Sequence, residues 1–184
     1  MKRFLMCVGL FAALPLLAQQ PSAQQKAPAS PPETASATIG GNTITITYSS
    51  PRVKGREGHI FGPGGLISHD PHYPVWRAGA NSATALHTNA DIKIGDLTVP
   101  KGDYTLFVDI SNPDAWTLIV SKDTHEWGLK YDPAKDLGKV PMTMSKPPST
   151  VEDLEWSITD NGGGKGTITL AWEDHSGSVP VSVP

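Results

Sequence analysis

A short polar string precedes one of the expected strands and could bind a ligand. Within eight residues it holds a guanidinium, a glycine, an amide and a hydroxyl: Arg77, Gly79, Asn81 and Thr84. Arginine offers a planar fork of donors, asparagine offers a donor and an acceptor, and glycine lets backbone amides approach a ligand. The string predicts a site for a carboxylate, a phosphate or a sugar hydroxyl, with Trp76 or Trp127 as a flat apolar wall for a sugar face. The alternative is structural: Arg77 pairs with an aspartate, while Asn81 and Gly79 shape a turn.

Three basic residues alternate with uncharged residues earlier in the chain: Arg52, Lys54 and Arg56. In an extended strand, alternate side chains point to the same side. The spacing therefore predicts a positive ridge, which could attract an anionic ligand at the rim of the Arg77 cleft. The alternative is a solvated sheet edge, where charges discourage aggregation between edges.

A histidine-rich segment is the one part of the sequence that resembles a metal site. It contains His69, Asp70 and His72, with His59 and Tyr73 nearby. Imidazole and carboxylate groups suit zinc, copper or iron. The His-x-x-His spacing with an intervening proline is not an established zinc pattern, so we expect no metal and no cofactor. The same three residues are the candidates if the protein is a metal-dependent hydrolase.

Catalytic motifs are missing from the sequence. It has no Gly-x-Ser-x-Gly elbow, no phosphate-binding glycine loop, no dinucleotide fingerprint and no His-Glu-x-x-His helix. Several carboxylates could form a glycosidase pair, but the sequence places no two of them at a working separation. Whether the protein is an enzyme stays open, and binding is favoured over catalysis.

The elements that must position these residues are short strands. Polar and apolar residues alternate at 43–48, and further short strands are expected at 83–88, 90–94, 97–99, 104–109, 115–120, 154–159 and 166–172, separated by glycine and proline turns. No stretch of ten residues holds a helical period without glycine or proline. This pattern predicts an antiparallel β-sandwich or jelly-roll-like barrel of about 8 to 9 strands, with few or no helices. The strand expected at 179–183 would lie at an edge.

Two segments do not fit the strand pattern and are candidates for function: 51–73 and 121–141. Each is longer than an ordinary connection inside one domain. The second contains Asp132 followed by Pro133, a pattern that favours a short helical turn with the aspartate as its cap.

The first residues read as an export signal. Lys2 and Arg3 precede an apolar run that ends at Ala18, and this run is too short to span a bilayer. We therefore expect a signal peptide over 1–18, a disordered Pro/Ala/Gln-rich tether over 19–36, and one domain over 37–184. The mature protein would be periplasmic or secreted and would have no membrane span. Its one cysteine, Cys7, would leave with the signal, so disulfides and thiolate metal sites are not expected.

Composition excludes several classes of protein. The 184 residues carry a formal net charge of −3, which argues against a nucleic-acid partner. The 18 glycines and 17 prolines argue against a long-helix or coiled-coil protein. Subtracting the expected signal and tether leaves 184 − 36 = 148 residues, which is the size of one domain.

Several strings resemble the bacterial domain of unknown function 2911 family. They are 48–56, 60–62, 94–107, Trp127-Gly128 and, most specific of all, the Trp-Arg-x-Gly-Ala-Asn-x-Ala-Thr string within 75–84. The resemblance implies an exported, mostly β domain, and it carries over no activity. The segment between Phe61 and Val75 is longer and richer in histidine than the family pattern, so a shared family role for its histidines does not follow.

Together these patterns predict an exported module that binds a small polar or anionic ligand, such as an envelope saccharide. Its cleft would be lined by Arg77, Asn81, Thr84 and Trp127, with Arg52, Lys54 and Arg56 at the rim. One alternative is a metal-dependent hydrolase that uses His69, Asp70 and His72. Another is a structural envelope protein without a small ligand, in which Arg77 is buried against an acid.

Overall fold

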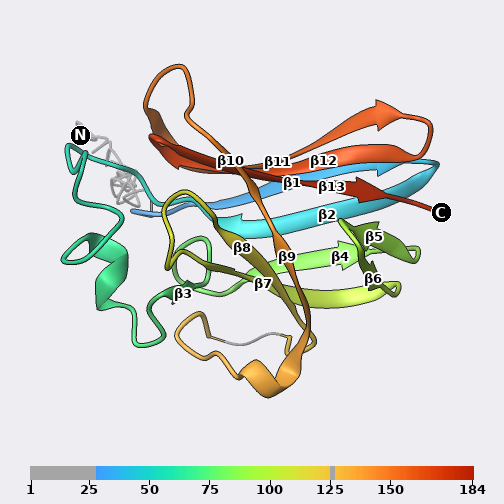
Figure 1. Ribbon diagram of the computed structural model, residues 1–184, viewed down its shortest axis with the longest axis horizontal. Helices are drawn as coiled ribbons and strands as arrows, with labels where there is room; N and C mark the ends of the chain where they lie inside the picture. Colours follow the sequence, from blue (N-terminus) through green and yellow to red (C-terminus); the bar gives the residue numbers. More distant parts are fainter. Residues whose placement is uncertain (1–27, 125–126) are drawn as a thin grey trace, which may run out of the picture.

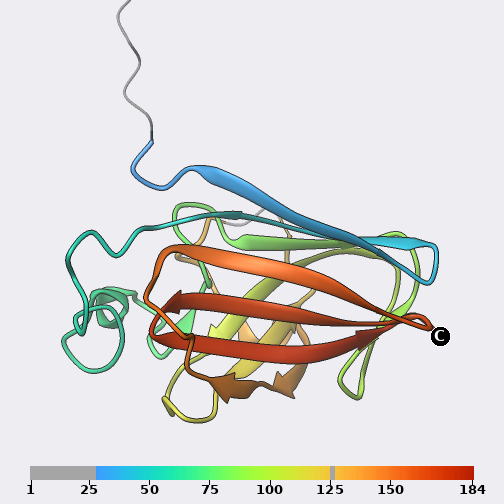
Figure 2. The same ribbon diagram turned by 90° about the horizontal axis from the view of Figure 1, so that it is seen from above.

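Two antiparallel β-sheets face each other across one apolar core in the computed structural model (Figures 1 and 2). The structure describes residues 28–124 and 127–184, and the expected signal peptide over 1–18 lies outside them. The all-β prediction is confirmed, and the arrangement is a sandwich rather than a closed barrel. Among the described residues, no helix has the length and apolarity that crossing a bilayer requires.

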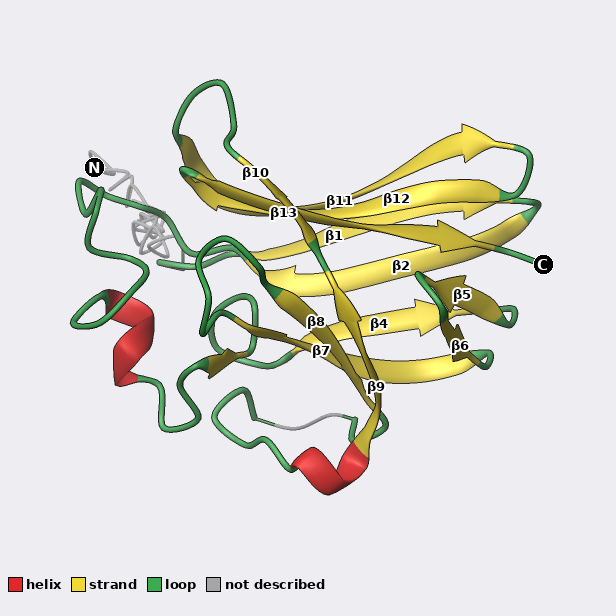
Figure 3. Ribbon diagram, in the orientation of Figure 1, coloured by secondary structure: helices red, strands yellow, loops and turns green. Residues whose placement is uncertain are grey.

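The larger sheet has the spatial order β1 (Pro32–Ile39), β2 (Asn42–Ser49), β4 (Thr84–Thr88), β7 (Gly102–Asp109), β8 (Thr117–Ser121) and β9 (Asp136–Pro141), and β3 (Val75–Trp76) also pairs with β7. The smaller sheet has the order β11 (Val151–Gly162), β12 (Lys165–Glu173), β13 (His175–Ser182), β5 (Ile92–Ile94) and β6 (Leu97–Val99), and β10 (Thr143–Ser145) also pairs with β13. Two short 3-10 helices, η1 (Leu66–His69) and η2 (Pro133–Lys135), lie in the long connections (Figure 3).

The core lies between the sheets and follows the alternation seen in the sequence. In β2, Ile44 and Ile46 point inward and are fully buried, while the threonines between them face outward. Trp156 of β11 is also buried, and its indole Nε1 donates to the Ala78 carbonyl at 2.9 Å. Each fully buried aliphatic side chain of this kind contributes about 1.5–3 kcal/mol through removal from water. This core holds the connections at the ends of the strands in place.

The strand count and the tether boundary need correction. Thirteen strands are described rather than about eight or nine, because β1, β3, β9 and β10 were not expected. Residues 32–36, expected to be tether, belong to β1, which pairs with β2 along its whole length. The small side chains of Ala35 and Ala37 give its alternation little apolar contrast. The strand expected at an edge, β13, lies inside its sheet between β12 and β5.

The segment between β8 and β9 covers part of the outer face of the larger sheet. Tyr131 packs on Phe107 of β7 with ring centroids 4.9 Å apart, and its hydroxyl donates to Asp136 at 2.8 Å. The predicted helical turn is confirmed as η2, where the Asp132 side chain accepts from the Ala134 amide at 3.0 Å. Phe107 is consequently buried although it faces away from the core between the sheets.

The other long connection, 51–73, is fastened to the smaller sheet. The Val53 amide donates to the Glu152 carbonyl at 2.8 Å, and the Gly58 amide donates to the carboxylate of Glu173 at the end of β12. The segment therefore forms a fixed wall at one end of the sandwich. It lies where Figure 1 shows the chain leaving β2 and returning through η1 to β3.

Candidate functional site

A cavity of about 230 Å³ lies at this end of the sandwich, between segment 51–73, the turn after β3, and β12. Its polar lining brings together residues that are distant in the sequence: His69, Asp70, Arg77 and Trp172. Arg77 and the histidine-rich segment, predicted as separate sites, therefore share one cavity. We call it the Arg77 cavity.

Arg77 is held by an acid on one side. Its Nη1 lies 3.4 Å from Oδ2 of Asp70, and the side chains of Arg77 and Asp70 are 20% and 7% exposed. The other oxygen of Asp70 accepts from the His72 amide at 3.1 Å. This partly buried ion pair agrees with the structural alternative for Arg77. The guanidinium also lines a cavity, as the ligand-binding prediction requires.

Two N–H donors of the lining are buried without partners. Arg77 Nε and Trp172 Nε1 have no hydrogen-bond partner within the described part of the chain. Trp172 is 1% exposed and stacks on Trp76, with ring centroids 5.9 Å apart. A buried donor without a partner costs about 1–3 kcal/mol, so such groups are usually satisfied by water or a ligand. These two donors are the strongest binding feature of the cavity.

The sequence places Trp172 at the end of the strand expected at 166–172. That placement is right, but the unpartnered indole N–H depends on how β12 meets segment 51–73. No local pattern in the sequence carries that information. The sequence offered only the residue type: the indole of tryptophan has one N–H donor, which needs a partner when it is buried.

The remaining wall of the cavity is apolar. It is formed by Pro51, Leu66, Ile67, Ala80 and Leu129. Leu66 and Leu129 are 41% and 39% exposed, and Trp127, at 56%, is the third exposed large hydrophobic side chain in the described residues. An exposed apolar rim around buried donors is typical of a small-ligand site.

Asn81, Thr84 and Trp127 do not line this cavity, which corrects the predicted cleft. Thr84 is fully buried, and its hydroxyl donates to the Ala78 carbonyl at 3.0 Å. Asn81 is exposed with φ 58°, a left-handed conformation that asparagine tolerates in turns. The backbone of Trp127 forms an isolated bridge with Ser82. These residues shape the turn that carries Arg77.

The predicted basic ridge does not form either. Lys54 has φ 51°, so the chain turns there instead of remaining extended. Arg56 folds back, and its Nε donates to the Val53 carbonyl at 2.9 Å. Arg52 pairs with Asp153 through Nε and Oδ1, 3.0 Å apart. The three basic residues therefore do not form one ridge, and none of them lines the Arg77 cavity.

The three residues proposed for a metal have separate partners. Nδ1 of His69 lies 3.2 Å from the Gly65 carbonyl, whereas Nε2 of His72 accepts from the Tyr131 amide at 3.3 Å. Asp70 pairs with Arg77. The structure therefore does not gather His69, Asp70 and His72 as ligands of one ion.

A different group of residues lies close enough to share an ion. Within residues 28–124 and 127–184, one potential ligand atom from each of Glu173, Asp174 and His175 lies within 4.8 Å of the others. Each has a structural partner: Glu173 accepts from the Gly58 amide, and Asp174 lies 2.6 Å from His175 Nδ1. Asp174 also pairs with Lys146 at 3.6 Å. These contacts account for the group as a brace between β12, β13 and segment 51–73.

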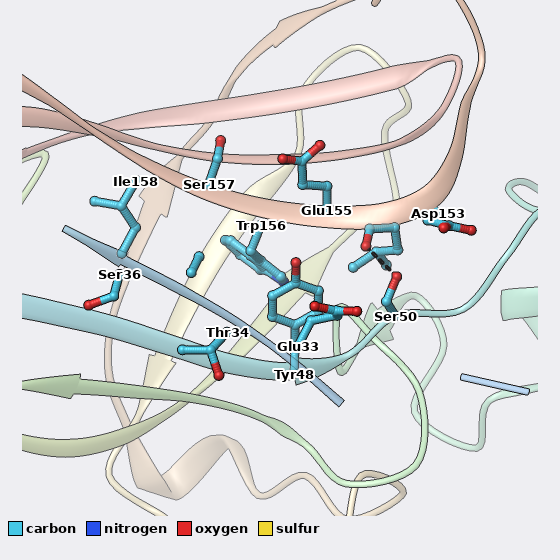
Figure 4. Close-up of a pocket in the computed structure, with 12 residues that line it drawn as sticks. Glu33, Thr34, Ser36, Tyr48, Ser50, Asp153, Glu155, Trp156, Ser157 and Ile158 are labelled. Carbon is cyan, nitrogen blue, oxygen red and sulfur yellow. Dashed lines mark hydrogen bonds between the residues drawn. The ribbon is translucent and has the colours of Figure 1, made fainter. Parts of the chain in front are cut away.

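A second concavity, of about 460 Å³, lies between the edge strands β1 and β11 (Figure 4). Three carboxylates line it: Glu33, Asp153 and Glu155. Burial raises the pKa of Tyr48 at its base, and the charges of Glu155 and Glu33 raise it further. The charge of this groove is opposite to what an anionic ligand needs.

Comparison with known proteins adds one finding. The model of a family described as "Protein of unknown function (DUF2911)" matches residues 30–181. The match includes the string that carries Arg77, segment 51–73 and β12. No curated protein and no solved structure matches the chain.

Proposed function

The chain belongs to the DUF2911 family of proteins of unknown function, and from this premise we propose that the domain is a binding module for a small polar or anionic ligand held in the Arg77 cavity. One observation carries the proposal: Arg77 Nε and Trp172 Nε1 are buried donors without partners, and both side chains line the cavity. Donors without partners select a ligand that accepts hydrogen bonds. A carboxylate, a phosphate and an oxygen-rich envelope saccharide all belong to this class.

Electrostatics favours an anionic acceptor over a neutral one. The guanidinium keeps its charge at every relevant pH, and hydrogen bonds between charged groups are about twice as strong as neutral ones. Asp70 holds Nη1, which leaves Nε as the unpartnered donor. Asp70 is thus a positioning residue, and Arg77 is the group that would touch the ligand.

We propose that this binding takes place after export, in the periplasm or outside the cell, because a signal-like segment precedes the domain. The lining combines unpartnered donors with an arginine that an aspartate holds in place, which suits the binding of a ligand. His69, Asp70 and His72 have separate partners, which argues against the metal-dependent hydrolase.

The first test measures the midpoint of thermal unfolding of residues 19–184 in the presence of acidic metabolites, phosphates, cell-wall sugars and metals. A ligand at 100 times its Kd should raise the midpoint by roughly 5 to 10 °C. Arg77→Lys keeps the charge but loses the fork of donors, so it should abolish the shift. Arg52→Lys is the matched control and should keep it. An equal shift in both variants would overturn the proposal.

A second pair of variants tests the indole donors directly. Trp172→Phe removes a donor without a partner, whereas Trp156→Phe removes a donor that already bonds to the Ala78 carbonyl. Both lose similar volume, so Trp156→Phe should cost about 1 kcal/mol more stability, the value of the lost bond. The ligand shift should vanish in Trp172→Phe and persist in Trp156→Phe. The reverse pattern would exclude the cavity.

The partly buried pair of Arg77 and Asp70 favours a second candidate, a structural envelope protein without a small ligand. It predicts that no compound shifts the midpoint, while Arg77→Lys lowers the midpoint of the protein alone. The same experiment therefore separates the two candidates.

A further inference from the structure

We infer that the ligand of the Arg77 cavity is a monocarboxylate with a short apolar tail. The inference rests on the proposed function and specifies its ligand class. It follows from the contrast between two parts of the lining: a pair of unpartnered N–H donors, and a wall of aliphatic side chains that ends in an exposed rim. A ligand that fits both parts has an anionic acceptor at one end and hydrocarbon at the other.

The polar part of the lining fits a carboxylate better than a sugar. A sugar presents many hydroxyls, each of which is both a donor and an acceptor. No serine, threonine, asparagine, glutamine or tyrosine is among the described residues that line the cavity. Two side-chain acceptors are present: the Asp70 carboxylate, which already binds Arg77, and Nε2 of His69, whose Nδ1 donates to the Gly65 carbonyl. The lining can therefore donate to oxygen atoms but has little to accept hydroxyl protons.

The charge of the cavity fits one negative charge. Among the described lining residues, Arg77 is the only lysine or arginine, and Asp70 stands 3.4 Å from it. A dianionic phosphate would meet the Asp70 carboxylate with no second cation to offset the repulsion. A single carboxylate carries less negative charge, so it can pair with the Arg77 guanidinium at a smaller cost from Asp70.

The apolar part of the lining calls for hydrocarbon. Leu66 and Leu129 are two of the three large hydrophobic side chains exposed in the described residues, and both line this cavity. Ile67 and Ala80 continue the wall inward. Apolar side chains gathered at the mouth of a concavity, rather than scattered over the surface, mark a place where apolar ligand surface is buried.

The size of the cavity limits the tail. A volume of about 230 Å³ holds roughly eight water-sized groups, at about 30 Å³ for each. A carboxylate takes about three of these positions and leaves about five for carbon atoms. Hexanoate has this size, and octanoate would extend past Leu66 and Leu129 into solvent.

The test is isothermal titration calorimetry on residues 19–184 with acetate, butyrate, hexanoate and octanoate. Affinity should rise about three- to fourfold for each added methylene up to hexanoate and then level off. Hexanamide and 1-hexanol should bind at least about tenfold more weakly than hexanoate, because they lack the charge. An affinity that does not depend on chain length, or equal binding of the alcohol, would overturn the inference.

Variants separate the two ends of the ligand. Leu66→Asn and Leu129→Asn should flatten the dependence on chain length while the weak affinity for acetate stays within about twofold. Trp127→Ser removes the exposed hydrophobic side chain that does not line the cavity, so it is the matched control and should leave the series unchanged. If Trp127→Ser flattens the dependence on chain length as much as Leu66→Asn does, the tail of the ligand does not bind specifically against Leu66 and Leu129.

Failure of this inference can be told from failure of the proposed function. If N-acetylglucosamine or inorganic phosphate binds in a manner that needs Arg77 and Trp172, while no carboxylate binds, the inference is overturned and the binding function stands. If none of these probes binds at a concentration about 100 times a typical millimolar Kd, both the inference and the proposed function are overturned. If hexanoate binds equally well to Arg77→Lys and Trp172→Phe, the Arg77 cavity is not its site.

Discussion

Arg77 uses different nitrogen atoms for two purposes. Nη1 forms the ion pair with Asp70, which orients the guanidinium, and Nε is buried without a partner. Removing Asp70 would leave a partly buried charge uncompensated, a loss that commonly costs several kcal/mol. Structure and binding therefore cannot be separated by deleting either residue, and variants that keep the charge are the informative ones.

Gly128 packs closely against the Arg77 side chain. A methyl group at this position would clash with the Arg77 side chain and with the Asn81 carbonyl. Gly128→Ala should therefore lower the free energy of unfolding by about 1–3 kcal/mol and weaken ligand binding. Chemical denaturation measures the first effect, and calorimetry with hexanoate measures the second.

Gly177→Ala is the control for this substitution. Its added methyl group would meet only the flexible ends of Met142 and Met144, at 3.1 Å. It should cost less than about 1 kcal/mol and leave binding unchanged. Equal losses in the two variants would mean that Gly128 does not act through Arg77.

Tyr131 should make stability fall at alkaline pH. Burial raises the pKa of its hydroxyl from 10.0, and the hydrogen bond to Asp136 raises it further. Above about pH 10 the unfolded chain releases this proton while the folded protein retains it, so the free energy of unfolding decreases as pH rises. Urea unfolding at several pH values between about 8 and 11 measures the slope.

Tyr131→Phe should reduce this slope without abolishing it. Tyr48 and Tyr104 also have raised pKa values, mainly through burial, and contribute in the same direction. An unchanged slope in Tyr131→Phe would show that Tyr131 titrates at the same pH in both states.

At the level of residues, the sequence identified Arg77 as a candidate but not the Trp172 and Leu129 side chains that line the cavity with it. The Trp-Arg-x-Gly-Ala-Asn string stood out because its residue types are those of binding sites. Thr84 shares that string, but its hydroxyl satisfies a buried carbonyl instead. Trp172 and Leu129 come from segments about 50 to 95 residues away, which only the tertiary fold brings to Arg77.

At the level of elements, β1 closes the side of the sandwich where the two sheets meet. It pairs with β2 along all eight of its residues and lies beside β11 of the other sheet (Figures 2 and 4). Without β1, the edge of β2 would be exposed, with a row of unpaired backbone groups that can pair with another chain.

Truncation tests the role of β1. A chain that begins at residue 37 should unfold at a lower temperature than one that begins at residue 28, and it should self-associate. Thermal unfolding and light scattering measure the two effects. If both chains have the same midpoint and remain monomeric, β1 is dispensable and the boundary expected from the sequence is adequate.

Strands were predictable where branched or aromatic residues alternate with polar ones. β2 and β12 have this contrast, β7 contains a continuous run of branched and aromatic residues, and the structure contains all three. β1 relies on alanines, whereas β9 contains Gly138 and ends at Pro141, so neither has strong local propensity. These strands form because a neighbouring strand offers hydrogen bonds, which a local pattern cannot reveal.

At the level of the whole molecule, the chain combines a domain with an N-terminal segment of different composition. The family match begins at residue 30, close to the first strand at residue 32. Periodicity and turn spacing were enough to predict one all-β domain, because they follow from the backbone geometry of short strands. The ligand was not predictable in this way, since sandwiches of one architecture have many functions.

Export gives a prediction for the whole chain. If residues 1–18 are a signal peptide, the protein recovered from its native host should begin at Gln19. Intact-mass measurement distinguishes this species from the full chain, and the chain expressed with a blocked export pathway is the control. A recovered protein that still carries Met1 would contradict the export prediction.

The fastening of segment 51–73 has a consequence for the time course of binding. Backbone bonds to Glu152 and the link between Gly58 and Glu173 fix this wall in the chain without any ligand. A site that already has its bound shape requires no slow rearrangement after encounter. Mixing with hexanoate should therefore give a single relaxation whose observed rate rises linearly with ligand concentration, and the lifetime of the complex would be set by dissociation alone.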